Sequence, residues 1–176
     1  VVMIRKVADT IDSISNVAAT IGGICLFVMS LLMMTEVVCR NYLNFSLVFS
    51  WEYSSYLMAT VYFLTAGFTL LVKGHVRVFL LAEALPEKTR FLLEVMATAT
   101  GMSIAGFVTY ALADFTYQSF IRGARTFLPS ETLLWPPQAV FTLGAFLLTL
   151  QLFARLVRLL IGEEPDRTLA QDELPE

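Results

Sequence analysis

Glu36 and Arg40 are four residues apart, in the order that favours an ion pair along a helix, and Glu52 follows them in the chain. Two hypotheses fit these residues. Glu52 can start a helix, where the helix dipole stabilises an acid. Alternatively, Arg40 can bridge both carboxylates and so fix the next helix or a docking surface. A bridge partly shielded from water would be stronger than an exposed pair, which contributes at most about 1 kcal/mol.

Lys73, His75 and Arg77 form a second ionisable group within the sequence KGHVR. Basic residues attract anionic lipid head groups by about 1 kcal/mol each, so the cluster fits an ordinary membrane anchor. An anchor alone does not explain why Gly74 and His75 interrupt the cluster. His75 is the single histidine, whereas a bis-histidine haem needs two imidazoles and a zinc site needs several ligands. We therefore expect no metal site or cofactor in this chain.

The charge pattern predicts the elements that hold these residues. The chain has 176 residues, of which 57% are hydrophobic and 15% charged, against roughly 25% charged residues in soluble domains. Four windows contain no charged residue: 13–35, 53–72, 95–113 and 132–154. About 20 apolar residues cross a bilayer as a helix. The sequence therefore predicts an all-α integral membrane protein with four transmembrane helices.

We predict a single membrane domain over residues 1–162. Its spans are expected near residues 14–38, 52–73, 89–120 and 137–161. The first apolar stretch is longer than the roughly 7–15 residues of a signal peptide, so we expect it to be retained as a helix. Residues 163–176 are acidic and contain prolines, which predicts a flexible tail. The net charge of −3 gives no indication of nucleic-acid binding.

The basic residues predict the orientation. Four spans place both termini and the loop 73–91 on one side of the membrane, and residues 36–52 and 114–131 on the other. Three of the 12 basic residues lie on the second side, namely Arg40, Arg122 and Arg125. Basic residues favour the cytoplasmic side of a membrane, and tryptophan favours the membrane interface. Trp51 and Trp135 both lie at the interface on the second side. Both termini and the acidic tail are therefore predicted to be cytoplasmic.

Packing and interface positions follow from the same layout. The apolar connections 41–51 and 76–86 are expected to lie along the interface as short amphipathic segments. Arg155 and Arg158 are expected to extend from the last helix to the cytoplasmic surface. Gly67 is one of the small residues at which helices can approach closely.

The spans contain little that suggests chemistry. Their middles have no ionisable residue, which disfavours a proton relay or ion site in this chain. The sequence has no GxSxG motif, and Cys39 has no histidine on its own side of the membrane, which disfavours nucleophilic catalysis. We expect most hydroxyls within the spans to bond their own helix backbone. These are Thr60, Thr65, Thr98, Thr100, Ser103 and Thr109.

The order and spacing of these features resemble the small membrane subunit, of the DctQ type, of tripartite ATP-independent periplasmic (TRAP) transporters. The resemblance covers residues 14–160 and includes four spans with both ends inside. Its motifs, in order, are Arg40, the Trp51-Glu52 helix start, Ala66-Gly67 and the HVRV that begins at His75. In this family the last motif usually continues H-x-x-V-D. Phe79 stands where that aspartate is expected.

The resemblance implies a non-catalytic subunit in the inner membrane of a bacterium or archaeon. Such transporters take up organic acids, for example C4-dicarboxylates or sialic acid, and are driven by a sodium gradient. A soluble periplasmic binding protein captures the substrate, and a large polytopic membrane subunit carries the substrate and sodium sites. The small subunit braces the large one, contacts membrane lipids and contributes to docking of the binding protein. A bound phospholipid between the subunits is also consistent with this arrangement.

The residues expected to serve these roles lie at both ends of the spans. We expect Arg122, Arg125 and Glu131 to help dock the binding protein. Contacts with the large subunit, or a structural role, are expected of Glu36, Arg40, Trp51, Glu52, Gly67, Lys73, His75 and Arg77. A membrane anchor or assembly subunit of a redox complex is the alternative function, and an intramembrane enzyme is a weaker one.

Overall fold

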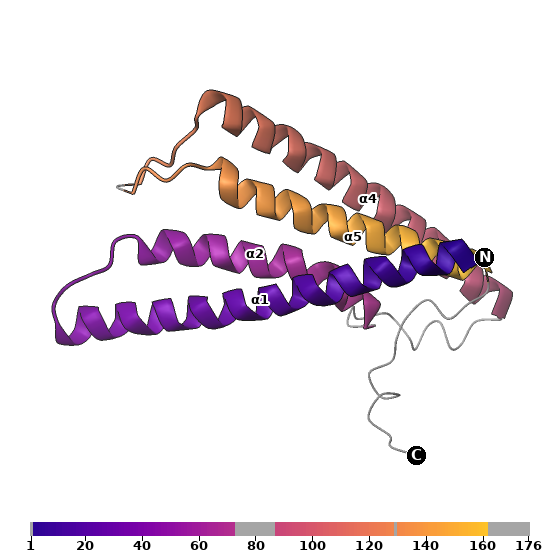
Figure 1. Cartoon of the computed structure of the whole chain (residues 1–176), viewed down its shortest axis with the longest axis horizontal. Helices are drawn as coiled ribbons and strands as arrows, with labels where there is room; N and C mark the ends of the chain where they lie inside the picture. The colour runs from indigo at the N-terminus through magenta and orange to yellow at the C-terminus, as the bar shows by residue number, and fades with distance from the viewer. Residues whose placement is uncertain (1, 73–86, 129, 162–176) are drawn as a thin grey trace, which may run out of the picture.

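The computed structural model describes residues 2–72, 87–128 and 130–161. The described residues form four long helices, which Figure 1 shows. These are α1 (Val2–Tyr42), α2 (Ser50–Leu71), α4 (Glu87–Arg122) and α5 (Trp135–Ile161). Each is long and apolar enough to cross a membrane. The predicted all-α fold with four membrane-spanning helices is confirmed.

The helix bounds differ from the predicted spans mainly in α1. This helix begins at Val2, well before residue 14, and has 41 residues, or about 60 Å at 1.5 Å per residue. That length is roughly twice the hydrocarbon thickness of a bilayer. α5 begins at Trp135 with two prolines in its first turn, where a missing N–H costs no helical hydrogen bond. Residues 43–49, part of one predicted interfacial segment, are not helical.

The four helices form two hairpins, α1 with α2 and α4 with α5 (Figure 1). α2 packs against α5 and joins the hairpins, and α1 also reaches α5. The hairpins spread apart toward one end of the molecule, which we call the loop end, where residues 43–49 and 123–134 connect the helices. The start of α1 and the end of α5 lie together at the opposite end, which we call the terminal end.

Close contact between α2 and α5 depends on a glycine. A Cβ added at Gly144 would lie 2.6 Å from the carbonyl carbon of Phe63 and 2.7 Å from its oxygen. Both are backbone atoms, so a side chain at residue 144 would force the helices apart. Gly67, predicted as a packing residue, lies in ordinary contact with Ser15, because its Cβ would be 3.4 Å from Ser15 Oγ. Small residues therefore set the spacing between these helices.

Replacing Gly144 with Ala should lower the free energy of unfolding by about 1–3 kcal/mol, the usual cost of overpacking. Gly23→Ala is the matched control, because a Cβ at Gly23 meets nothing within 4 Å and alanine favours the helix. The control should leave stability unchanged or raise it. Unfolding of both variants in mixed detergent micelles measures the difference. Equal stability of the two variants would contradict the close approach of α2 and α5.

Hydroxyl groups inside the helices also connect them. Thr65, Ser103 and Thr109 donate to backbone oxygens one turn earlier, at 2.7, 2.9 and 2.8 Å, as predicted for these three residues. The Thr109 hydroxyl also lies 3.1 Å from that of Thr149. A second pair of threonine hydroxyls links α4 to α5 at 3.0 Å. These pairs add polar contacts to an otherwise apolar interface between two helices.

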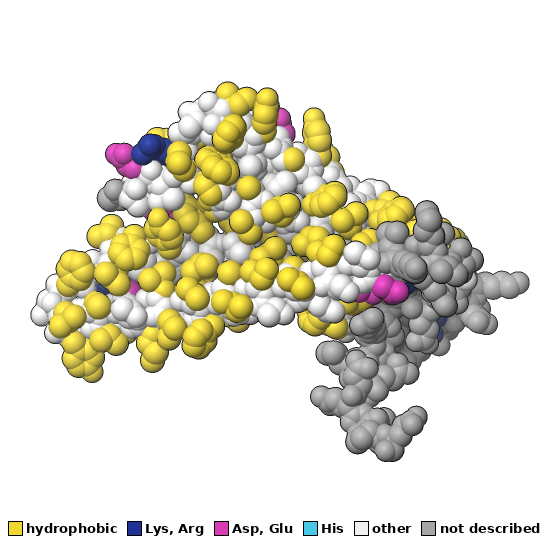
Figure 2. Space-filling model, viewed as in Figure 1, with side chains coloured by type: hydrophobic (Ala, Val, Ile, Leu, Met, Phe, Trp, Pro, Cys, Tyr) yellow, Lys and Arg dark blue, Asp and Glu magenta, His cyan; other side chains and the backbone are white. Residues whose placement is uncertain are grey.

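Apolar side chains cover much of the surface seen in Figure 2, and charged side chains lie toward its ends. Large exposed hydrophobic residues occur on every helix, for example Phe27, Tyr62, Phe107 and Leu143. The buried residues, in contrast, include Asp12, Glu36, Glu52 and Gln151. Lipid accommodates an apolar exterior, whereas polar groups in a membrane protein face the interior and pair there. The buried polar residues are therefore the starting point for a functional site.

Candidate functional site

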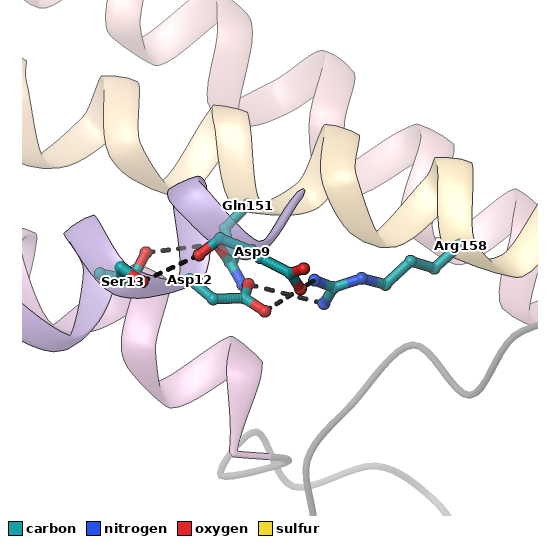
Figure 3. Close-up of polar contacts among 6 residues, drawn as sticks. Asp9, Asp12, Ser13, Gln151 and Arg158 are labelled. Atoms are coloured by element: carbon teal, nitrogen blue, oxygen red, sulfur yellow. Dashed lines mark hydrogen bonds and ion pairs between the residues drawn. The ribbon is translucent and has the colours of Figure 1, made fainter. Parts of the chain in front are cut away.

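An ion pair connects the first helix to the last at the terminal end of the bundle (Figure 3). Arg158 Nη2 of α5 lies 2.6 Å from Asp12 Oδ2 of α1, and only 3% of the Asp12 side chain is exposed. Arg158 also lies 3.7 Å from Asp9, whose side chain is 67% exposed. The guanidinium therefore forms its close contact with the buried carboxylate. Removing one partner of such a buried pair leaves a charge without compensation.

Two polar side chains complete the contacts of Asp12. Gln151 Nε2 donates to Asp12 Oδ1 at 2.8 Å, and Ser15 Oγ donates to Gln151 Oε1 at 3.2 Å. We call Asp9, Asp12, Ser15, Gln151 and Arg158 the terminal-end cluster. It lies next to the small apolar core formed by Ala8, Ile11 and Ala154. Both oxygens of Asp12 have donors, so the cluster can hold α1 against α5 without leaving a buried charge unpaired.

The terminal-end cluster corrects one prediction from the sequence. Arg158 does not extend freely to the membrane surface, because its side chain is 14% exposed and pairs with Asp12. Arg155 is also buried, at 7% exposure. The sequence contained a signal for this cluster: Asp12 directly precedes a charge-free window, and Gln151 interrupts the apolar stretch of α5. Because α1 and α5 run in opposite directions, these two positions meet at the same end (Figure 1).

Glu36 closes the turn between α1 and α2 at the loop end. Ser46 Oγ donates to Glu36 Oε1 at 2.8 Å, and the Leu47 N–H donates to Oε2 at 2.7 Å. Glu36 is 8% exposed. Asn44 in the same turn has a φ of 51°, a left-handed conformation that asparagine tolerates better than most residues. The Glu36 carboxylate therefore accepts hydrogen bonds from the connection between α1 and α2, which is not helical.

Glu52 attaches the α4–α5 loop to the start of α2. It lies in the first turn of α2, as the helix-dipole hypothesis predicts, and is 4% exposed. Tyr56 donates its hydroxyl to Glu52 Oε1 at 2.9 Å. Ser130 donates to Oε2 from a position 78 residues later in the chain. Glu52 thus joins the two hairpins at the end where they otherwise spread apart.

The bridging hypothesis for Arg40 is wrong in the described part of the chain. No ion pair within 4.0 Å joins Arg40 to Glu36 or Glu52 there, although the charge of Arg40 still attracts that of Glu36 at longer range. Both carboxylates accept hydrogen bonds from other groups. Arg40 instead occupies the last turn of α1, where a cation is stabilised by the helix dipole. Trp51 is 75% exposed at the start of α2, a position that suits the membrane interface.

The predicted docking residues fall into two groups. Arg125 Nη1 lies 3.9 Å from Glu131 Oε2 across the α4–α5 loop, and both side chains are exposed. Arg122 is apart from this pair, because its Nη2 donates to Gln118 Oε1 on α4 at 3.2 Å. Gln118 donates in turn to Asp114 at 2.7 Å. The structure therefore brings Arg125 and Glu131 together and places Arg122 in a polar row along the end of α4.

The basic group predicted at the other end of α2 lies outside the described residues. This applies to Lys73, His75 and Arg77, to Phe79, and to the predicted interfacial segment 76–86. Their roles stay predictions. Among the described residues, no group of three or more His, Cys, Asp or Glu side chains is placed to hold a metal ion.

A cavity of about 440 Å³ lies between the first turns of α2 and α5. Its lining is mainly aromatic, aliphatic and prolyl, with two threonines: Tyr53, Tyr56, Leu57, Thr60, Thr132, Leu133, Pro136 and Pro137. Tyr56 lines the cavity and also donates to Glu52. A pocket of this composition suits a hydrocarbon chain better than a charged ligand.

Comparison with known proteins gave one family match. The family model described as "Tripartite ATP-independent periplasmic transporters, DctQ component" matches residues 29–162. The matched region includes the last part of α1, from residue 29 to Tyr42, and the whole of α2, α4 and α5. No curated protein and no solved structure matched the chain.

Proposed function

Because this chain belongs to the DctQ family of TRAP transporter components, we propose that it braces the large membrane subunit of such a transporter and does not itself carry the substrate. Membership of this family identifies the chain as the small membrane subunit, a multi-pass protein of the inner membrane. It also implies association with a large membrane subunit and a substrate-binding protein.

The use of the buried carboxylates supports a bracing role. Asp12, Glu36 and Glu52 accept hydrogen bonds from groups of this chain. Apart from the Tyr56–Glu52 contact, which lies within α2, these contacts join separate helices or fix a connection between them. A site for sodium or an organic acid needs ligands or charges directed at the bound species. We therefore assign the sodium and substrate sites to the large subunit of a sodium-driven transporter for organic acids, in which this chain is a non-catalytic subunit.

The proposed orientation places the terminal end in the cytoplasm and the loop end in the periplasm. The positive-inside pattern of the sequence supports this assignment. The α4–α5 loop with Arg125 and Glu131 would then face the periplasmic binding protein. The cavity between α2 and α5 would lie near the periplasmic interface, where an acyl chain of a bound phospholipid could fill its apolar interior.

Arg125→Glu tests the docking role. The pair of Arg125 with Glu131 is exposed and contributes at most about 1 kcal/mol, so the variant should fold and copurify with the large subunit. Charge reversal should nevertheless lower binding-protein-dependent uptake in proteoliposomes by about 10-fold or more, the effect of a like-charge contact at an interface. This chain reconstituted without the large subunit is the control and should show no uptake. Unchanged uptake by Arg125→Glu would exclude the docking role of this pair.

A further inference from the structure

Backbone hydrogen bonds connect the described residues of the α4–α5 loop, which are 123–128 and 130–134. The backbone N–H groups of Thr126 and Leu134 donate across the loop to Thr132 and Ala124, both at 3.0 Å. At its tip, the Glu131 N–H donates to the Leu128 carbonyl at 2.9 Å. Ser130 attaches the loop to Glu52 of α2. A loop fixed in this way loses little conformational freedom when a partner binds it.

This ordered loop carries Phe127 with its side chain fully exposed, at 109% of the reference area. Leu128 beside it is 47% exposed, and the exposed Arg125 and Glu131 lie on the two arms of the loop. Protein interfaces are typically built from an aromatic anchor that fills a pocket, surrounded by polar residues. The loop tip has this composition before any partner is present.

The position of the loop favours a soluble partner over the lipid bilayer. The charge-free window of α4 ends at Asp114, and the helix continues to Arg122, a further distance of about 12 Å. Polar contacts run along this last part of the helix from Asp114 through Gln118 to Arg122. Such side chains suit water and head groups, although the same stretch also exposes Phe115, Tyr117, Phe120 and Ile121. The loop follows this stretch in the chain, and Phe127 lies in it between the charged Arg125 and Glu131. The sequence pattern therefore does not place Phe127 in the hydrocarbon layer of the membrane.

We propose that Phe127, presented by the loop that Glu52 holds, is the anchor residue by which a soluble protein with an apolar pocket docks on this subunit. The inference rests on the proposed docking function and identifies its central contact, with Arg125 and Glu131 at the rim. A partner that fits offers a pocket for one aromatic ring and polar groups around it. The binding protein of the same transport system is the expected occupant.

Binding of the purified binding protein to the two-subunit complex in nanodiscs tests the anchor. Phe127→Ala should weaken binding by about 10-fold or more, as for an aromatic hot spot, without reducing copurification of the large subunit. Phe45→Ala is the matched control, since Phe45 is a 60% exposed phenylalanine on the other loop-end connection. It should leave affinity within about twofold of the wild type, the range of energetically neutral contacts.

The outcomes separate the anchor from the proposed function. Loss of binding in Arg125→Glu with full binding in Phe127→Ala would overturn the anchor and keep the docking role. Equal binding to the large subunit with and without this chain would overturn both. Phe127→Trp adds a readout of location: its fluorescence should shift to shorter wavelength only when the binding protein is added. A shift in nanodiscs without the binding protein would show a lipid-inserted tip and also overturn the proposal.

Discussion

Asp12→Ala should lower the free energy of unfolding by about 3–5 kcal/mol, because it removes one partner of a buried ion pair. Arg158 would be left with Asp9 at 3.7 Å, and the Asp9 side chain is 67% exposed, so screening by water weakens that contact. Gln151 would lose an acceptor at the same time. Unfolding of the purified chain in mixed detergent micelles measures the change.

Asp9→Ala is the matched control for this prediction. Asp9 lies on the same helix and near the same arginine, yet its side chain is mostly exposed. The control should change the free energy of unfolding by less than about 1 kcal/mol. Similar losses in the two variants would contradict the assignment of Asp12 as the principal partner of Arg158.

Double substitution separates pairing from packing. Arg158→Met removes the guanidinium and keeps an apolar side chain of similar length. If Asp12 and Arg158 stabilise the fold by pairing, Asp12→Ala combined with Arg158→Met should cost less than the two single changes added together. The interaction energy should be about 1–3 kcal/mol. Additive losses would show that the two residues act independently.

Glu52→Ala should destabilise the loop end, because a hydrogen bond to a charged group contributes about 1.5–3 kcal/mol and this change removes the acceptor of two such bonds. Tyr56 and Ser130 would both lose their acceptor. The hydrogen bond from Ser130 attaches the α4–α5 loop to α2. Loss of this bond should therefore loosen that loop before other parts of the protein. Amide hydrogen exchange across residues 124–134 should become faster, while exchange within α4 stays slow.

Glu131→Ala is the control for the loop. Glu131 belongs to the loop itself, but its side chain is 74% exposed and lies 3.9 Å from Arg125. This change should leave exchange in residues 124–134 close to that of the wild type, because an exposed pair contributes little. Equally fast exchange in both variants would mean that Glu52 does not hold the loop. Under the anchor proposal, Glu52→Ala should also weaken binding, since Phe127 would no longer be presented by an ordered loop.

The four helices could be predicted because the bilayer imposes a simple rule on the sequence. A helix that crosses hydrocarbon needs about 20 apolar residues, and the charge-free windows show where these are. The length of α1 could not be read in this way. Its first turns contain charged residues and so do not fit the rule, yet Ala8, Ile11 and Asp12 pack against α5. Helical structure continues there because another helix covers that face.

The candidate site was predicted in part for the same reason. Glu36 and Glu52 could be singled out because acids beside long apolar stretches are unusual. Their partners could not be identified, and Arg40, the nearest basic residue in the sequence, pairs with neither. Ser130 lies 78 residues from Glu52, and Arg158 lies 146 residues from Asp12. No spacing within a single helix relates residues so far apart.

The sequence by itself determined that this protein lies in a lipid bilayer, that its described residues form four long apolar helices, and the class of transporter subunit to which it belongs. These properties are set by runs of apolar residues and by the order of short motifs along the chain. Only the tertiary structure decided which helices touch and which charges pair. A buried carboxylate takes the donor that packing brings within hydrogen-bond distance, and the packing of α1 on α5 and of the α4–α5 loop on α2 exists only in three dimensions.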